Sequence, residues 1–418
     1  MTGDNKEVIT GSDFKRMIAG AYSEFLLEYE NINGLEGGGC LAGTHILRTM
    51  NAAIMPLADV KDTSIGGLAS RVATAAVFGA RGNSGVVLAQ MFRGIAKGLS
   101  GKYNATSSEF GKAFQYGILH AQRVIPEQPD RPFITAAKAA AKGAYHAVRA
   151  NMPISEMLTA ALNAGEKSLT EKEKNEAGSR IMSVFLNGCL KGLDGNFVSP
   201  AVSLSLGLKS WENISDPRKD MVRPYCVTFS LKNPLLRCSE VENQLKEFSN
   251  FALVNRWNSE IEVHLHTNFV GHVIEQAVGW GLLRNIRITN MSEPHALNVH
   301  DALMNVAALA VAEDEETAHR LQDAGASIIV SGSEASCPSV AELVNAAHSD
   351  MADYYVMVAS SPDYRLVFRQ AKRLLGSRVE LVLADSIETA EKALNCFSSE
   401  KSAIENAEAM TAALNQNK

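Results

Sequence analysis

The chain has 418 residues and carries 40 Lys and Arg against 46 Asp and Glu, a formal net charge of −6. This length allows two to four domains, and the shares of hydrophobic (46%) and charged (21%) residues exclude a mainly disordered chain. The mild negative charge argues against a nucleic-acid binder, and no apolar run is long enough to cross a bilayer. The N-terminus lacks the apolar segment of a signal peptide, and six irregularly spaced Cys are typical of reduced thiols. We therefore expect a cytoplasmic, multi-domain protein.

Residues 12–210 are predicted to be almost wholly helical. Apolar residues recur at three- and four-residue steps from Phe14 to Phe25, and Ser12 is placed to cap this first helix. The same pattern predicts helices over residues 68–78, 86–99, 114–124, 134–148, 157–169 and 181–193. Loops with Gly and Pro separate them, so we expect an N-terminal eight-helix bundle or barrel.

The pattern changes after residues 199–221, which are predicted to form a linker. Residues 225–232 and 260–266 alternate between apolar and polar, as strands do, and residues 240–251 and 270–281 are predicted helices. We expect a small α+β middle domain with one sheet and helices on one face.

From Val306 onward, short apolar strands alternate with helices. The strands are predicted at 307–311, 327–330, 354–359 and 379–383, and the helices at 313–323, 340–348, 364–375 and 387–395. This alternation is typical of parallel βαβ units. The expected fold class is multi-domain α and α/β, with domains at 1–205, 206–300 and 301–418.

Two glycine-rich stretches stand out in the helical part, Gly37-Gly-Gly-Cys-Leu-Ala-Gly-Thr-His45 and Gly79-Ala-Arg-Gly-Asn-Ser-Gly85. Backbone N–H groups at a helix start can hold a phosphate; alternatively, the glycines only let helices pack closely. His45 could act as a metal ligand, but a single imidazole there is more typical of a local cap or surface residue. The candidate cofactor-binding residues are Gly43, Thr44, His45, Gly82, Asn83, Ser84 and Gly85.

Residues 33–49, followed by GARGNSGVVLAQMFRGIAKGL, resemble the dihydroxyacetone-kinase L-type domain at the front of bacterial fatty acid kinase catalytic subunits. Cys226 and the stretch VHLHTNFVGHVIEQAVGWGLLRNIRITNM resemble the middle domain of that family, and residues 332–339 resemble its DegV-like C-terminal domain. The family's C-terminal domain continues beyond the segment that matches residues 404–414, so we expect a truncated DegV-like domain here. The resemblance implies an ATP-dependent kinase ancestry and a role in lipid metabolism.

The first glycine stretch departs from that family. In the family, the corresponding loop reads roughly NVFPVPDGDTGTN, and its two aspartates hold the Mg²⁺ ions that bridge the ATP phosphates. The corresponding residues are Gly39 and Leu41, neither of which has a side-chain oxygen, and His45 stands at the following Asn. The family's EGT-type turn is replaced in this chain by residues 130–133. The family's VDAGGQGL stretch has a different sequence here, at residues 175–182. Because phosphoryl transfer depends on the metal, we expect a pseudokinase in which Mg-ATP binding is doubtful.

A cysteine and two histidines are the candidate metal ligands. Alternation places His264 and His266 on one strand face together with Glu262, and Cys226 on the polar face of the other strand. If the strands are neighbours, one thiolate and two imidazoles converge, which suits a reactive Zn²⁺ with an open position. The resemblance implies that Cys226, His264 and His266 are zinc ligands. The other cysteines, Cys337 in its loop included, are expected to be ordinary thiols.

Three hypotheses follow. The first is a degenerate fatty acid kinase homologue that binds or regulates an acyl-carrying, fatty-acid-binding DegV-like partner. The second is an active phosphotransferase that makes acyl phosphate, with a metal cage rebuilt from Asn33, Glu36 and Glu176. The third is a metal-dependent hydrolase at the Cys/His site. No nucleic-acid partner is expected, and a homodimer is left open.

Overall fold

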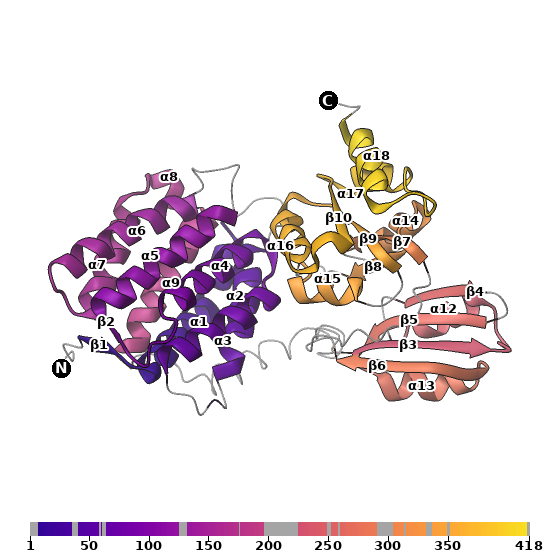
Figure 1. The fold of residues 1–418 in the computed structure, drawn as a ribbon, viewed down its shortest axis with the longest axis horizontal. Helices are drawn as coiled ribbons and strands as arrows, with labels where there is room; N and C mark the ends of the chain where they lie inside the picture. Colours follow the sequence, from indigo (N-terminus) through magenta and orange to yellow (C-terminus); the bar gives the residue numbers. More distant parts are fainter. Residues whose placement is uncertain are drawn as a thin grey trace. The chain divides into compact units, whose positions relative to one another are not determined.

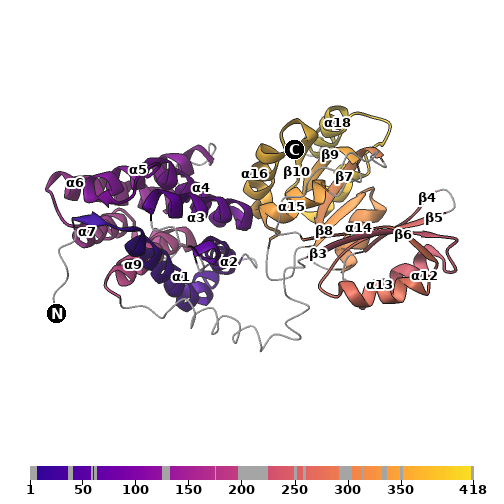
Figure 2. The ribbon, with the colours of Figure 1, turned by 60° about the horizontal axis from the view of Figure 1, so that its bottom comes forward.

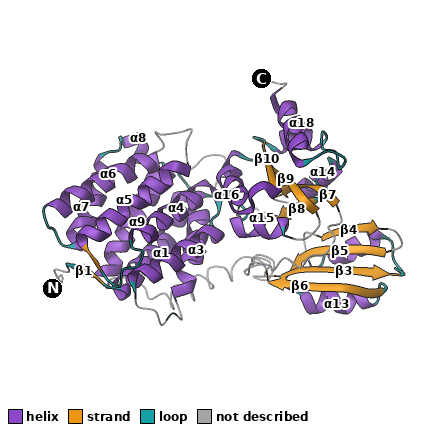
Figure 3. Cartoon of the chain, in the orientation of Figure 1, coloured by secondary structure: helices purple, strands orange, loops and turns teal. Residues whose placement is uncertain are grey.

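The computed structural model describes residues 7–35, 41–57, 60, 64–124, 132–174, 176–195, 225–248, 252–257, 260–290, 304–312, 315–331, 337–348 and 352–415. It divides into two compact units. The first comprises Met1–Ser210 together with Ala335–Val340, and the second comprises Trp211–Glu334 and Ala341–Lys418. Figure 3 shows that helices make up the first unit almost entirely, whereas the second mixes helices and strands.

The first unit is a ring of helices (Figure 1, indigo to magenta). Each long helix packs against the next in the chain, and the last packs against the first, so the ring closes. Its helices are α1 (Gly11–Asn33), α2 (Ala42–Ile54), α3 (Ile65–Gly79), α4 (Gly82–Gly98), α5 (Ser107–Val124), α6 (Pro132–Arg149), α7 (Ile154–Lys167), the short α8 (Glu171–Lys174) and α9 (Ala177–Leu193). A 3₁₀ turn η1 (Met55–Leu57) follows α2, and β1 (Val8–Ile9) pairs with β2 (Ala105–Thr106). The predicted helices are confirmed.

The first helix begins two residues earlier than a Ser12 cap predicts. Thr10 is the N-cap residue, and its hydroxyl accepts a hydrogen bond from the Asp13 amide while the Asp13 carboxylate accepts one from the Thr10 amide. This capping box satisfies two amides at the helix start and leaves Ser12 inside α1. The Ser12 prediction was therefore wrong. Phe14 and Phe25, at the expected spacing, are fully buried.

The middle of the chain forms a four-stranded antiparallel sheet in the order β4-β5-β3-β6. Its strands are β3 (Tyr225–Lys232), β4 (Ala252–Trp257), β5 (Glu260–Thr267) and β6 (Leu282–Asn290), and its helices are α12 (Cys238–Leu245) and α13 (Val270–Val278). Both helices lie on one side of the sheet (Figure 2) and share one core with alternate residues of β3 and β5. The two predicted strands, β3 and β5, are confirmed, and they pair directly with each other. The prediction missed β4 and β6 and made α12 too long.

The last part of the chain forms a parallel four-stranded sheet in the order β10-β9-β7-β8. Its strands are β7 (Met304–Ala312), β8 (Ile328–Ser331), β9 (Ala352–Ala359) and β10 (Val379–Leu383). Its helices are α14 (Glu315–Asp323), α15 (Val340–Ala347), α16 (Arg365–Leu375), α17 (Ile387–Leu394) and α18 (Ala403–Asn415), with 3₁₀ turns η2 (Pro362–Tyr364) and η3 (Gly376–Arg378). The predicted parallel βαβ arrangement is confirmed. The domain boundaries predicted at 205/206 and 300/301 lie outside the described residues and stay predictions.

Candidate functional site

The start of α2 carries the first group of predicted site residues. Asn33, the last residue of α1, accepts a hydrogen bond from the Thr44 amide through Oδ1 (3.1 Å) and donates one to the Thr44 hydroxyl through Nδ2 (2.9 Å). Gly43 lies so close to α1 that an added Cβ would come within 2.0 Å of the Tyr29 carbonyl oxygen. Leu41 is the N-cap residue of α2 and makes no side-chain cap hydrogen bond. Glu36 and Gly39 lie outside the described residues.

The second group begins α4. We predicted a helix start near Val86, but α4 begins at Gly82, so Gly82, Asn83, Ser84 and Gly85 form its first turn. Gly82 has φ +58°, which glycine tolerates best.

Three glycines face α2 at a close helix crossing. An added Cβ at Gly82 would come within 2.4 Å of His45 Nδ1, and one at Gly85 within 2.4 Å of Thr49 Oγ1. One at Gly79 would come within 2.2 Å of the Ala52 Cβ. These glycines therefore have a clear packing role.

His45 is buried rather than at the surface, so its interpretation as a cap or surface residue was wrong. Burial, as the largest cause, and the nearby charges of Arg81 and Arg48 together lower the pKa of its imidazole to about 4. The ring is therefore neutral at pH 7. Its Nε2 accepts a hydrogen bond from the Cys337 amide at 3.1 Å.

Residues Cys337–Val340, which we call the strap, belong to the same compact unit as the helices. The Arg81 guanidinium donates a hydrogen bond to the Cys337 carbonyl oxygen at 2.9 Å, and the Val340 amide donates one to the Ala80 carbonyl at 3.1 Å. Ser339 forms an isolated antiparallel bridge with Arg81. All four strap residues are buried, and the Cys337 thiol is buried with them. No motif in the sequence predicts this contact.

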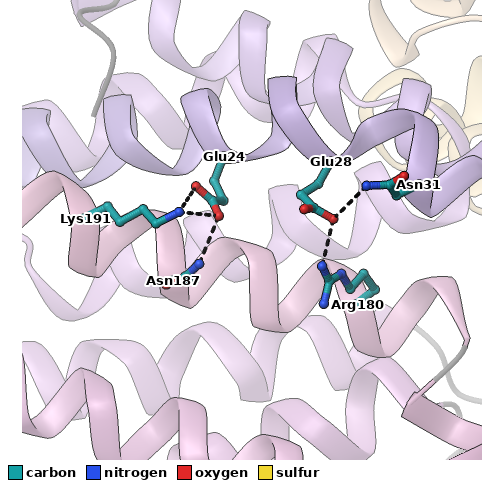
Figure 4. Close-up of polar contacts among 6 residues, drawn as sticks. All are labelled: Glu24, Glu28, Asn31, Arg180, Asn187 and Lys191. Atoms are coloured by element: carbon teal, nitrogen blue, oxygen red, sulfur yellow. Dashed lines mark hydrogen bonds and ion pairs between the residues drawn. The ribbon is translucent and has the colours of Figure 1, made fainter. Parts of the chain in front are cut away.

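The start of α9 lies beside the C-terminal half of α1. It falls within residues 175–182, where this chain differs from the family's VDAGGQGL stretch. Arg180 donates a hydrogen bond to the Glu28 carboxylate at 2.8 Å and thereby lowers the pKa of that carboxyl (Figure 4). One turn back along α1, Glu24 accepts hydrogen bonds from Lys191 (2.7 Å) and Asn187 (2.9 Å). These polar contacts hold α9 against α1. Glu176, a candidate metal ligand, is the N-cap residue of α9.

The middle sheet brings the predicted zinc ligands to neighbouring backbone positions. Cys226 on β3 is the direct cross-strand partner of His266 on β5, and His264 is the partner of Thr228, two residues along. The side chains of Cys226, His264 and His266 lie outside what the structure describes. Among the side chains that it does describe, no group of three or more His, Cys, Asp or Glu could hold a metal ion.

Comparison with known proteins then identifies the chain. A DAK2 domain model matches residues 42–186. Models of the middle and C-terminal domains of FakA-like fatty acid kinase proteins match residues 223–298 and 307–418. The chain belongs to the FakA-like fatty acid kinase family. Proteins of this family normally work with a partner protein, and the DAK2 domain suggests nucleotide and Mg²⁺ use.

Two relatives show how far the similarity extends. Protein YloV of Bacillus subtilis (strain 168) is 25% identical over 407 residues, which is 90% of this chain and 73% of YloV. An uncharacterized protein of Staphylococcus epidermidis is 24% identical over 405 residues, 89% of this chain and 73% of its own length. Within the described residues, no helix is long and apolar enough to span a membrane.

Proposed function

We propose that this member of the family no longer transfers phosphate efficiently and instead binds or regulates an acyl-carrying, DegV-like partner. The observation that carries the proposal is the chemistry at the start of α2. Leu41 stands at the N-cap with a hydrocarbon side chain, and the first turns of both α2 and α4 contain no acidic residue. Mg²⁺ needs oxygen ligands, usually carboxylates, to neutralise charge between ATP phosphates. The described residues there do not fit a Mg·ATP site.

Two further features support the proposal. Gly82 and Gly85 pack closely against α2, so their presence needs no bound phosphate to explain it. His45 is neutral and its Nε2 already accepts a hydrogen bond from the Cys337 amide, so it does not replace a lost carboxylate.

Isothermal titration of Mg·ATP into the purified chain tests this proposal. We expect no Mg²⁺-dependent heat of binding, because the metal lacks its carboxylates. The matched variant is Leu41→Asp, which restores one carboxylate and also adds a favourable N-cap worth about 1 kcal/mol to α2. Tight, Mg²⁺-dependent binding to the unaltered chain would contradict the proposal.

A rebuilt metal cage is the second candidate function, and one observation favours it. Asn33 lies at the end of α1 within hydrogen-bond distance of Thr44, so an amide oxygen is present beside the start of α2. In that case Glu36→Ala would abolish any Mg²⁺-dependent ATP binding, whereas Glu30→Ala, an exposed position on α1, would not.

We also propose a zinc ion in the middle domain. The cross-strand pairing of Cys226 with His266, and the place of His264 two residues along β5, support it. One thiolate and two imidazoles suit Zn²⁺ and leave a position for water or another ligand, so the site is either structural or hydrolytic. Metal analysis of the purified chain should give about one zinc, lost in Cys226→Ser and kept in Cys238→Ser. Zinc retained in Cys226→Ser would contradict the proposed site.

A further inference from the structure

Four neighbouring helices of the ring carry a concentration of positive charge. Across α3, α4, α5 and α6 the sequence places eight Lys and Arg but a single acidic residue, Glu109. The Glu109 carboxylate forms an ion pair with Lys102 at 2.6 Å, so it does not neutralise the cations on these helices. The chain as a whole has a net charge of −6, so this part of the ring has the opposite sign.

The pair α4 and α5 brings several of these cations together. The two helices lie side by side in the ring (Figure 1), and an added Cβ at Gly94 would come within 2.2 Å of the Tyr116 carbonyl oxygen. Their backbones therefore touch at this crossing. Arg93 and Lys97, one turn apart on α4, flank Gly94, and both side chains are exposed.

His120 on α5 lies within electrostatic reach of three of these cations. Burial, the largest cause, and the charges of Arg123, Arg93 and Lys97 lower the pKa of its imidazole. Like charges gathered in this way repel one another, and a negatively charged partner removes that repulsion.

A stripe along α5 adds uncharged side chains to the cations. Four exposed residues recur at steps of four, three and four and so lie on one side of the helix: Lys112, Tyr116, Leu119 and Arg123. Tyr116 is 49% exposed and Leu119 is 50% exposed, with a cation at each end of the stripe. We call this stripe, together with Arg93 and Lys97, the basic face.

The make-up of the basic face favours an anionic bilayer over an acidic protein. An aromatic and an aliphatic side chain between cations is typical of helices that lie at a membrane surface, where Tyr sits among the headgroups and Lys and Arg meet lipid phosphates. A stable protein interface takes about 20–30 residues a side around an apolar core. Only two of the six residues of the basic face are uncharged, which is too few for such a core.

We propose that the basic face docks the helical unit on membranes that contain anionic phospholipids. The attachment is peripheral: the four Lys and Arg meet headgroup phosphates, and Tyr116 and Leu119 enter the interface. Each cation near an anionic bilayer contributes about fivefold to the partition constant, so the four together contribute on the order of several hundredfold. This docking holds whether or not the chain transfers phosphate, so a failure of the proposed function leaves it standing.

Vesicle flotation of the full chain tests the docking. The probes are vesicles of phosphatidylcholine alone and vesicles that also contain about 30% phosphatidylglycerol. We expect the partition onto anionic vesicles to exceed that onto neutral vesicles by at least about tenfold, and salt raised from about 0.1 M to about 0.5 M to abolish the difference. Equal partition onto both vesicles, or a difference that persists in high salt, would overturn the proposal.

Two double variants show which face makes the contact. Arg93→Gln with Arg123→Gln removes two cations of the basic face and should weaken binding to anionic vesicles about 25-fold. The matched control, Lys167→Gln with Lys172→Gln, removes two exposed cations from α7 and α8 and should weaken it less than about threefold. Circular dichroism at 222 nm checks that both proteins stay helical. Equal vesicle binding by the two double variants overturns the basic face as the docking surface.

Tyr116→Trp reports on contact between α5 and the bilayer. Relative to the unaltered chain, its added fluorescence should shift to shorter wavelength on anionic vesicles and stay unchanged on neutral ones. An unshifted spectrum with bound anionic vesicles overturns the contact. If the chain ignores anionic vesicles but loses a DegV-like partner when Arg93 and Arg123 are replaced, an acidic protein occupies this face, and the proposal is likewise overturned.

Discussion

Acidification should destabilise the helical unit through one side chain, His45. Burial is the main reason that its pKa is lowered from 6.5 to about 4, and the charges of Arg81 and Arg48 add to the effect. The unfolded chain therefore binds a proton near pH 6.5, whereas the folded chain resists protonation until about pH 4. The stability contributed by neutral His45 is complete above pH 6.5 and is lost as the pH falls toward 4.

The size of this loss follows from the two pKa values. The difference between 6.5 and about 4 corresponds to about 3 kcal/mol of unfolding free energy, since one pKa unit is worth about 1.4 kcal/mol. Protonation also removes the lone pair on Nε2 that accepts a hydrogen bond from the Cys337 amide, so this one hydrogen bond to the strap is lost with it.

Urea unfolding followed by circular dichroism at 222 nm, between pH 7 and pH 4, measures this effect. His45→Phe is the matched variant, because it keeps an aromatic ring at this position but does not titrate. Other titrating groups cancel in the difference between the two proteins, so the unaltered chain should lose about 3 kcal/mol more than His45→Phe. Equal pH dependence in both proteins, or a His45 NMR resonance that titrates near pH 6.5, would refute the reasoning.

Two substitutions test how α1 and α9 are held together. Gly192→Ala places a Cβ within 2.2 Å of the Arg16 carbonyl oxygen. It should therefore lower the free energy of unfolding of the helical unit by about 1–3 kcal/mol, measured by urea unfolding. The control is Gly34→Ala, whose Cβ makes only ordinary contacts of 3.5 Å and which should have a milder effect. Glu24→Gln removes the ion pair with Lys191, whose side chain is 43% exposed, so thermal unfolding should reveal a loss of only about 1 kcal/mol. An unchanged midpoint for Gly192→Ala, or a loss well above 3 kcal/mol for Glu24→Gln, would contradict these assignments.

Local patterns predicted most of the fold. Ile261, Val263 and Leu265 alternate along β5, and all three are buried in the core shared with α12 and α13. The edge strand β6 was missed because a bulge shifts the pairing between Thr228 and Ser230. A shifted register breaks the two-residue alternation that identifies a strand from sequence.

The contacts around the glycine stretches were harder to predict. Gly79, Gly82 and Gly85 recur at three-residue steps, and this spacing could have suggested a close helix crossing. His45 and Cys337, in contrast, are 292 residues apart, and no local pattern connects them. Their contact depends on long-range packing, and so does the burial that lowers the pKa of His45, so neither could be predicted from the local sequence.

We propose that a chain with Gly39 and Leu41 at the positions that the resemblance assigns to two metal-binding aspartates no longer transfers phosphate efficiently. The most direct test is Mg²⁺-dependent acyl-phosphate formation by the purified chain with a fatty-acid-loaded DegV-like protein, using a homologue that carries both aspartates as the positive control. We predict that the chain forms no more acyl phosphate with Mg²⁺ than in a reaction without Mg²⁺. Mg²⁺-dependent formation of acyl phosphate at the rate of the control homologue would contradict the proposed loss of phosphate transfer.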